Sequence, residues 1–224
     1  MIDNIRINHV VKGKIHTTFG TLDLYRFSIT DLLKSPMEAV EHLAVVKQKD
    51  VTWEGSVLCR FNSACITSEV FNCTRCDCKW QLDKAMELIC QEGQGIITYH
   101  SSHEGRGFGL AAKLLSYNKM DEGLHTVDSY MQLGTGMEDG RDYRASIAIL
   151  HYFKITEVRL MGNNKRKYEA IRNAGIEVTD RFALVYEGTD QKVWHYLNNK
   201  AQEPEQDLLR HRLEQVNVQE WSIG

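Results

Sequence analysis

The chain has 224 residues, of which 42% are hydrophobic, and a net charge of −3. This length allows one sizeable core, and the near-neutral charge gives no electrostatic case for a nucleic-acid or membrane partner. The segment Met1–Lys14 lacks the apolar run of a signal peptide, and no stretch reaches the roughly 18 apolar residues of a membrane span. We therefore expect a cytoplasmic protein.

The first sixty residues are typical of β structure, because short runs of β-branched and apolar residues alternate with Gly, Asp or Glu. The strands expected there are His9–Ile15, Leu22–Phe27 and Ser56–Phe61. Helices and strands alternate afterwards. The helices expected are Lys79–Glu92 with Gly93 as its stop, Leu110–Met120, Tyr143–Phe153 and Lys165–Asn173; the strands are Gly95–Tyr99, Glu157–Met161 and one that begins at Ile176. This order predicts an α/β (α+β) fold, with a mixed sheet flanked by helices and the site on loops that the sheet carries.

No linker or internal repeat divides the chain. We expect one catalytic domain over residues 1–203 and a polar helical tail over residues 204–224. Within the tail, Glu205–Val216 carries leucines at helical spacing. This pattern favours a terminal helix docked on the body or on a partner.

Six cysteines are present, and their clustering without a secretion signal indicates metal binding or catalysis before disulfides. Cys65, Cys76 and Cys78 could supply three ligands to a catalytic zinc ion that keeps one position open. Cys73 could add a fourth ligand and make the site structural. The third possibility is a set of reduced cysteines without metal.

Three loops before predicted helices carry groups suited to phosphate. The glycine-rich segment His103–Gly109 lets the backbone approach a ligand and includes an arginine and a glutamate. Asp139 could cap the next helix, or it could orient Arg141 toward a phosphate. Gly162–Lys167 places a basic helix start at the end of a strand. Each loop alone also fits an ordinary turn, cap or solvated charge, but together with zinc they indicate hydrolysis of a nucleotide or other phosphorylated substrate.

These motifs, in this order, resemble the GTP cyclohydrolase II family, which carries out the first committed step of riboflavin synthesis. The resemblance runs from about Val10 to Ala201. The segments that carry it are Arg60-Phe61-Asn62-Ser63-Ala64-Cys65, Arg75-Cys76-Asp77-Cys78-Lys79-Trp80-Gln81, Glu104-Gly105-Arg106, His125-Thr126-Val127, Gln132-Leu133-Gly134, Asp139-Gly140-Arg141-Asp142-Tyr143, and Asn163-Asn164 with Lys167.

The resemblance implies zinc-dependent hydrolytic opening of the imidazole ring of GTP. Pyrophosphate and formate would be released, and a ribosylated diaminopyrimidinone phosphate would remain. One Zn²⁺ per chain would be held by Cys65, Cys76 and Cys78, and Mg²⁺ would accompany the pyrophosphate of the substrate. Family members usually dimerise, so we expect a homodimer that binds a purine nucleotide, GTP.

The resemblance also implies roles for single residues. Arg141 would attack the α-phosphorus, Asp139 would accept its proton, and Tyr117 would assist the ring chemistry. A guanidinium is normally too firmly protonated for attack, so the carboxylate and a bound phosphate would be essential. Gln81 and Glu104 would read the base. The full set expected to bind substrate is Arg60, Asn62, Ser63, Gln81, Glu104, Gly105, Arg106, Thr126 and Lys167.

The sequence departs from the family pattern around the substrate. Asn62 and Ala64 replace a histidine and a glutamate, Gly162 replaces a threonine, and the segment Ser101–His103 is one residue longer than usual. A proline after Asn164 is replaced by Lys165, and Thr67-Ser68-Glu69 replaces Thr-Gly-Asp. Three readings follow: a divergent GTP cyclohydrolase II, a paralogue that acts on a related nucleotide or stops at the formamidopyrimidine, or a zinc- or nucleotide-binding protein without catalysis.

Overall fold

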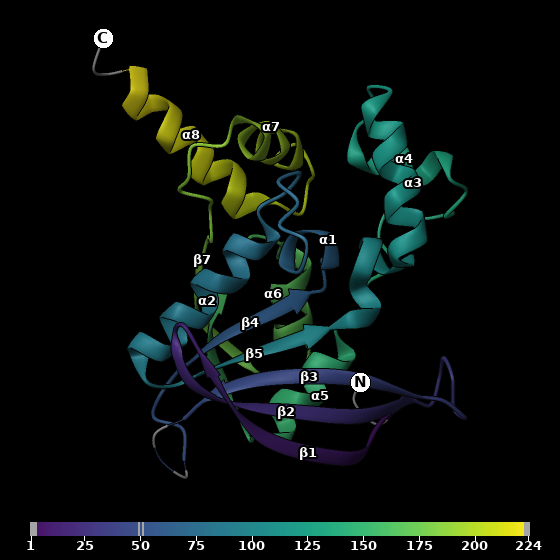
Figure 1. The fold of residues 1–224 in the computed structure, drawn as a ribbon. Coiled ribbons are helices and arrows are strands. Elements are labelled where there is room, and N and C mark those ends of the chain that lie inside the picture. The colour runs from purple at the N-terminus through teal and green to yellow at the C-terminus, as the bar shows by residue number, and fades with distance from the viewer. Residues whose placement is uncertain (1–3, 49, 51, 222–224) are drawn as a thin grey trace.

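The structure is a computed structural model that describes residues 4–48, 50 and 52–221, with side chains to Gln215. Its centre is a seven-stranded mixed sheet in the order β1-β2-β3-β5-β4-β6-β7 (Figure 1). The strands are β1 Ile5–Thr17, β2 Gly20–Asp31, β3 Ala39–Lys47, β4 Val57–Ser63, β5 Gly95–His100, β6 Glu157–Met161 and β7 Glu177–Phe182. The mixed sheet with flanking helices confirms the expected α/β (α+β) fold.

The sheet has two halves. Strands β1, β2, β3 and β5 pair antiparallel, whereas β5, β4, β6 and β7 pair parallel. The strand β3 was not expected from the sequence. It buries His42, Ala44 and Val46 at alternate positions, and its hydrogen bonds to β2 and β5 hold a segment whose histidine and alanine give a weak apolar signal.

Helices cover both faces of the sheet. They are α1 Ile66–Glu69, α2 Cys78–Glu92, the 3₁₀ segment η1 Ser101–Gly107, α3 Gly109–Asp121, α4 Thr126–Gln132, α5 Arg144–Tyr152, α6 Lys165–Asn173, α7 Gln191–Lys200 and α8 Asp207–Trp221. One core cluster joins the sheet to α5 and α6 through Ile147, Leu150 and Ile171. A second joins it to α2 through Ala85 and Ile89. The helices α1, α4 and α7 were not expected from the sequence.

Local signals set most helix ends. Gly93 ends α2 with φ 81°, a left-handed conformation that glycine adopts without strain. Asn164 caps α6 by accepting from the Arg166 amide. The possibility that Asp139 caps α5 was wrong: the helix begins after Tyr143, and the Asp139 carboxylate instead accepts from the Arg141 amide.

The C-terminal helix begins at Asp207, two residues after its expected start. Leu209 and Leu213 are buried in a third cluster with Val193 and Leu197 of α7. The tail therefore docks on α7, as its leucine spacing indicated.

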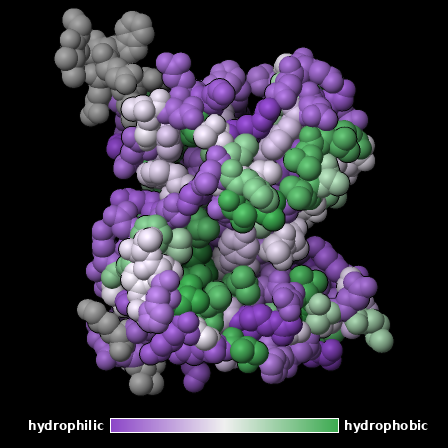
Figure 2. Space-filling model, viewed as in Figure 1, coloured by the Kyte–Doolittle hydropathy of each residue, from purple (hydrophilic) through white to green (hydrophobic). Residues whose placement is uncertain are grey.

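The helices α3 and α4 form an arm that projects from one end of the sheet (Figure 1). Hydrophobic side chains gather over this arm and over α1 (Figure 2). The exposed ones are Ile66, Val70, Phe71, Leu110, Leu114, Leu115 and Met131. In the described part of the chain, no helix combines the length and apolarity needed to cross a membrane.

Candidate functional site

Three cysteine sulfurs meet where β4 and α2 approach each other. Cys65 directly precedes α1, and Cys78 is the first residue of α2. The sulfurs of Cys65, Cys76 and Cys78 all lie within 4.8 Å of one another. Cys73 belongs to no such group among the described residues. The geometry therefore matches three protein ligands rather than four.

The chemistry of the donor set fits a zinc ion. Hydrogen bonds from Cys76 and Cys78 lower the pKa of the Cys65 thiol, although burial opposes this change. The cluster therefore favours one thiolate, at Cys65, whereas the hydrogen bonds to Cys65 raise the pKa of the Cys76 and Cys78 thiols. Zinc binds cysteine as the thiolate and accepts a set of three such ligands in catalytic sites.

A cleft opens beside the cysteines, and we call it the cysteine cleft. It brings together residues from β4, η1, the arm and α7, and from the loop that precedes α5. The expected site residues that line it are Ser63, Cys65, Cys76, Cys78, Gly105, Arg106, Tyr117, Thr126 and Arg141. The other six expected residues do not line it: Asp139 is half-buried, and Arg60, Asn62, Gln81, Glu104 and Lys167 are buried.

Two of these buried residues are cations with few partners. Arg60 donates to Asn62 and Gln81, but its Nη1 is buried without a hydrogen-bond partner. Lys167 donates to the Phe61 carbonyl at 2.6 Å. Burial, with Arg60 and Arg141 nearby, holds the pKa of Lys167 well below its usual value. A cluster of poorly compensated cations is suited to an anionic ligand.

Arg141 lies at the edge of the cysteine cleft with its guanidinium held by Asp139. Nε donates to Oδ1 at 2.8 Å and Nη2 donates to Oδ2 at 2.5 Å. Arg166 contributes a second cation 2.8 Å from the same carboxylate. Although burial opposes it, the hydrogen bonds from Arg141 keep the pKa of Asp139 low, at about 2. Nη1 of Arg141 is the nitrogen that this pairing leaves for another ligand.

The glycine-rich loop packs tightly against the Arg141 loop. Gly107 has φ +90°, and a Cβ at this position would lie 3.0 Å from the Gly140 backbone. The Gly140 amide also donates to the Arg106 carbonyl. Glycine at 107 therefore permits the contact that places Arg106 and Arg141 in one cleft.

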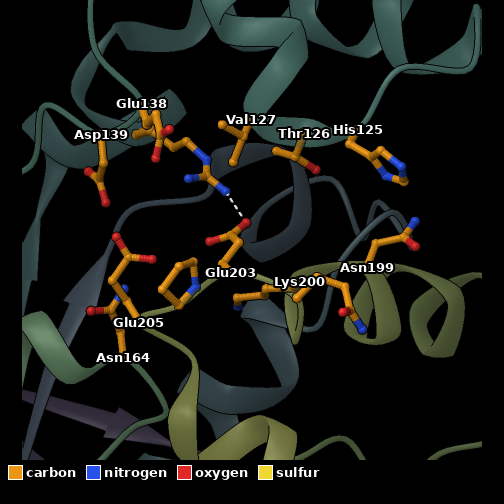
Figure 3. Close-up of a pocket in the computed structure, with 13 residues that line it drawn as sticks. His125, Thr126, Val127, Glu138, Asp139, Asn164, Asn199, Lys200, Glu203 and Glu205 are labelled. Atoms are coloured by element: carbon orange, nitrogen blue, oxygen red, sulfur yellow. Dashed lines mark hydrogen bonds and ion pairs between the residues drawn. The ribbon is translucent and has the colours of Figure 1, made fainter.

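The chain's later segment forms a second pocket next to the cysteine cleft, which we call the outer pocket (Figure 3). Asn199, Lys200, Glu203 and Glu205 line one side of it, and the start of α4 lines the other. Glu203 forms an ion pair with Arg106, and both side chains are 14% exposed. Sequence reasoning did not identify Glu203, because no motif marks it.

The loop Ser101–His103 places a histidine in the cysteine cleft. His103 lies 3.2 Å from the Ser63 hydroxyl through Nδ1 and contacts the Asp142 carbonyl through Nε2. Its ring stacks on His100, which in turn contacts His42. His103 of the loop is therefore the first of three buried histidines in contact, followed by His100 and His42.

The substituted positions before Cys65 also have defined surroundings. Asn62 donates to Glu69, and Glu69 also accepts from the Cys65 amide and the Tyr99 hydroxyl. Ala64 lines the cysteine cleft without a polar group. Tyr117 forms a hydrogen bond with Thr67, and burial raises the pKa of its phenol.

Known proteins resemble this chain over most of its length. A family model for GTP cyclohydrolase II matches residues 8–183. GTP cyclohydrolase-2 of Hahella chejuensis is 37% identical over 195 residues, which cover 87% of this chain and 89% of that protein. A riboflavin biosynthesis protein of Vibrio vulnificus is 38% identical and covers 87% of this chain, but the match covers 50% of that protein.

A chloroplastic monofunctional riboflavin biosynthesis protein of Arabidopsis thaliana is 35% identical over 80% of this chain and 34% of its own length. The chain thus spans half or less of several curated relatives that it matches. A two-domain 3,4-dihydroxy-2-butanone 4-phosphate synthase structure from A. baumannii aligns at a TM-score of 0.40 with 15% identity, over 81% of this chain and 41% of that one. The family match and the relative of similar length place this chain in the GTP cyclohydrolase II family, a family of hydrolases.

Proposed function

We propose that this chain opens the imidazole ring of GTP hydrolytically, with release of pyrophosphate and formate, as a GTP cyclohydrolase II of riboflavin biosynthesis. The observation that carries the proposal is that the cysteine cluster and Arg141 line one cleft. A hydrolytic metal and a phosphate-directed arginine at one site suit a substrate that has both a purine ring and phosphates.

The buried cations Arg60 and Lys167 would hold the phosphates after the side chains that separate them from the cleft move on binding. Arg60 offers an unpaired N–H, and Lys167 offers an ammonium that a phosphate would stabilise. Phosphate oxygens accept charge-assisted hydrogen bonds from both groups. Mg²⁺ would accompany the leaving pyrophosphate.

Arg141 would attack the α-phosphorus through Nη1. The N–P bond forms as the bond between the α-phosphorus and the bridging oxygen breaks, and the electron pair leaves with pyrophosphate. Although burial opposes it, Tyr143 and the hydrogen bond to Asp139 hold the pKa of Arg141 above its usual value, so free deprotonation is unfavourable. The proton would therefore pass to Asp139 as the N–P bond forms, because phosphorylation reduces the basicity of the guanidine. Water then cleaves the N–P bond and restores Arg141.

The ring chemistry would take place at the cysteines. Cys65, Cys76 and Cys78 would hold Zn²⁺, which supplies Lewis acidity and a water that ionises near pH ~7 when it is bound. The phenol of Tyr117 is protonated at neutral pH, as tyrosine ordinarily is, and burial raises its pKa further. Tyr117 can therefore donate a hydrogen bond to the opening ring from the same cleft.

A second candidate is a paralogue that acts on a related nucleotide or stops at the formamidopyrimidine. The surroundings of Asn62 favour this candidate, because its side-chain amide already donates to Glu69 and accepts from Arg60. The neighbouring Ala64 offers no acceptor to the substrate. Without an acceptor, a polar group on the ligand would cost about 1–3 kcal/mol if it stayed unpaired.

One assay separates these functions. Zinc-loaded protein is incubated with GTP and with other purine and pyrimidine nucleotides, and pyrophosphate, formate and the mass of the base product are followed. All three products from GTP support the proposal. Pyrophosphate without formate supports the early stop, and no turnover with stoichiometric zinc leaves a binding protein.

The assembly and the domain limits are also proposals. We propose that residues 1–203 form the catalytic domain, that residues 204–224 belong to a polar tail whose helix is α8, and that two copies pair through the apolar face of the arm. Leu114 belongs to that face and is 48% exposed. Sedimentation analysis tests the pairing: Leu114→Glu should give a monomer, and an unchanged dimer would place the interface elsewhere.

A further inference from the structure

Lys113, on the inner face of α3, is buried beside the cysteine cluster. Its Nζ donates to Sγ of Cys65 at 2.9 Å and lies 2.6 Å from Oε1 of Glu104. The side chains of Lys113 and Glu104 are each 10% exposed. An ammonium this deeply buried requires opposite charge nearby, and here both partners belong to the candidate site.

The carboxylate of Glu104 also accepts hydrogen bonds from two backbone amides, one next to Cys65 and one in the glycine-rich loop. Its Oε2 accepts from the Ile66 amide at 2.7 Å, and Oε1 accepts from the Gly105 amide at 3.0 Å. Ile66 directly follows Cys65. The pair Lys113–Glu104 therefore ties the turn that carries Cys65 to the glycine-rich loop.

Gly105 makes this arrangement possible. Its φ is +56°, and a Cβ there would lie 3.2 Å from Cβ of Lys113. The loop thus packs directly on the stem of the lysine. A displaced lysine would leave the carboxylate of Glu104 buried without its cation.

We infer that Lys113 is a positioning residue for the metal cluster: it holds the Cys65 thiolate in place and offsets its charge. Three thiolates and one divalent cation carry a net charge of −1, and the ammonium of Lys113 lies against that charge while the Glu104 carboxylate holds it there. A hydrogen bond to a thiolate also withdraws electron density from sulfur, so that the sulfur donates less to a bound metal. This inference rests on the proposed function only for the assignment of the cysteines as ligands.

Cobalt substitution tests the inference without relying on catalysis. Protein loaded with Co²⁺ in place of zinc shows sulfur-to-cobalt charge-transfer bands in the near ultraviolet. Lys113→Met should move these bands to lower energy, because the sulfur becomes a better donor. Lys113→Gln keeps an N–H donor without the charge and should give a smaller shift. Lys119→Met is the matched control, since Lys119 lies on the same helix and pairs with Glu122 at the surface.

The kinetics give a second readout. Lys113→Met should lower kcat for GTP by about 10–100-fold, the usual effect of losing a partner of a metal ligand. The KM should change much less. Loss of cobalt from Lys113→Met, with binding retained in Lys113→Gln, would also support the positioning role.

Unchanged charge-transfer bands at one Co²⁺ per chain in Lys113→Met would overturn the inference. The proposed function fails separately: wild-type protein that shows the cobalt bands but does not turn over GTP refutes catalysis and leaves the lysine test intact.

Discussion

Glu203 lines the outer pocket and forms an ion pair with Arg106 of the glycine-rich loop (Figure 3). A phosphate that binds Arg106 must replace this carboxylate. Glu203→Gln should therefore lower the KM for GTP, by about 5-fold if the pair contributes about 1 kcal/mol, with little change in kcat. Glu205→Gln is the control, because Glu205 lines the same pocket. A higher KM for Glu203→Gln would show that the carboxylate assists binding.

Lys167→Met should separate stability from function. The substitution removes a buried cation whose pKa burial has lowered, so the free energy of unfolding should rise by roughly 1 kcal/mol. The KM for GTP should rise at least about 10-fold, because a phosphate contact is lost. Thermal unfolding and steady-state kinetics measure the two effects. Lys165→Met, at an exposed position on the same helix, should change neither; a destabilised Lys167→Met with normal KM would refute the phosphate role.

Arg141→Ala should abolish pyrophosphate release and ring opening together, with a fall of at least about 10³-fold. Zinc content should stay at one ion per chain, because in the described part of the chain the Arg141 side chain bonds to Asp139 and not to the cysteines. Arg166→Ala is the matched control, since Arg166 shares the Asp139 carboxylate without the proposed attack. Pyrophosphate release at the normal rate from Arg141→Ala would eliminate it as the nucleophile.

Cys73→Ser should retain zinc, whereas Cys76→Ser should lose it. The reason is geometric: the sulfurs of Cys76 and Cys65 are 3.6 Å apart, whereas Cys73 is outside the cluster. Metal analysis after dialysis measures the ratio of zinc to protein. Zinc loss in both variants would point to a structural site with four cysteines.

Stability should fall in acid below pH ~6.5, the ordinary pKa of histidine. Burial lowers the pKa of His42 to about 4 and that of His103 to about 3, and it also depresses the pKa of His100. The unfolded chain therefore gains protons between pH ~6.5 and ~4 while the folded chain does not, and folding weakens by up to about 1.4 kcal/mol per pH unit for each histidine. Above this window the three groups are neutral in both states and have no effect.

Urea unfolding at several pH values measures this slope. His42→Gln should reduce the slope of unfolding free energy against pH by about 1.4 kcal/mol per pH unit, which corresponds to one proton. His151→Gln, at an exposed position, should leave the slope unchanged. An equal slope in wild type and His42→Gln would exclude His42 as one of the groups responsible.

Local pattern predicted much of the fold. The strand Glu157–Met161 and the helix Lys165–Asn173 have the expected bounds, because their apolar periodicity and end signals agree. β3 was missed because its pairing partners, rather than its own composition, make it a strand. The helix α7 was missed although Val193 and Leu197 are buried, because their burial depends on α8.

The sequence by itself determined the family, the order of most strands and helices, and the cysteine spacing that suits a metal. Only the tertiary structure decided that Cys73 stands apart from the other three cysteines, that Glu203 pairs with Arg106, and that Lys113 contacts Cys65. The physical reason is range. Spacing and periodicity report neighbours along one element, whereas these contacts join residues 48 and 97 positions apart, and their geometry follows from how the arm and the C-terminal segment pack around the sheet.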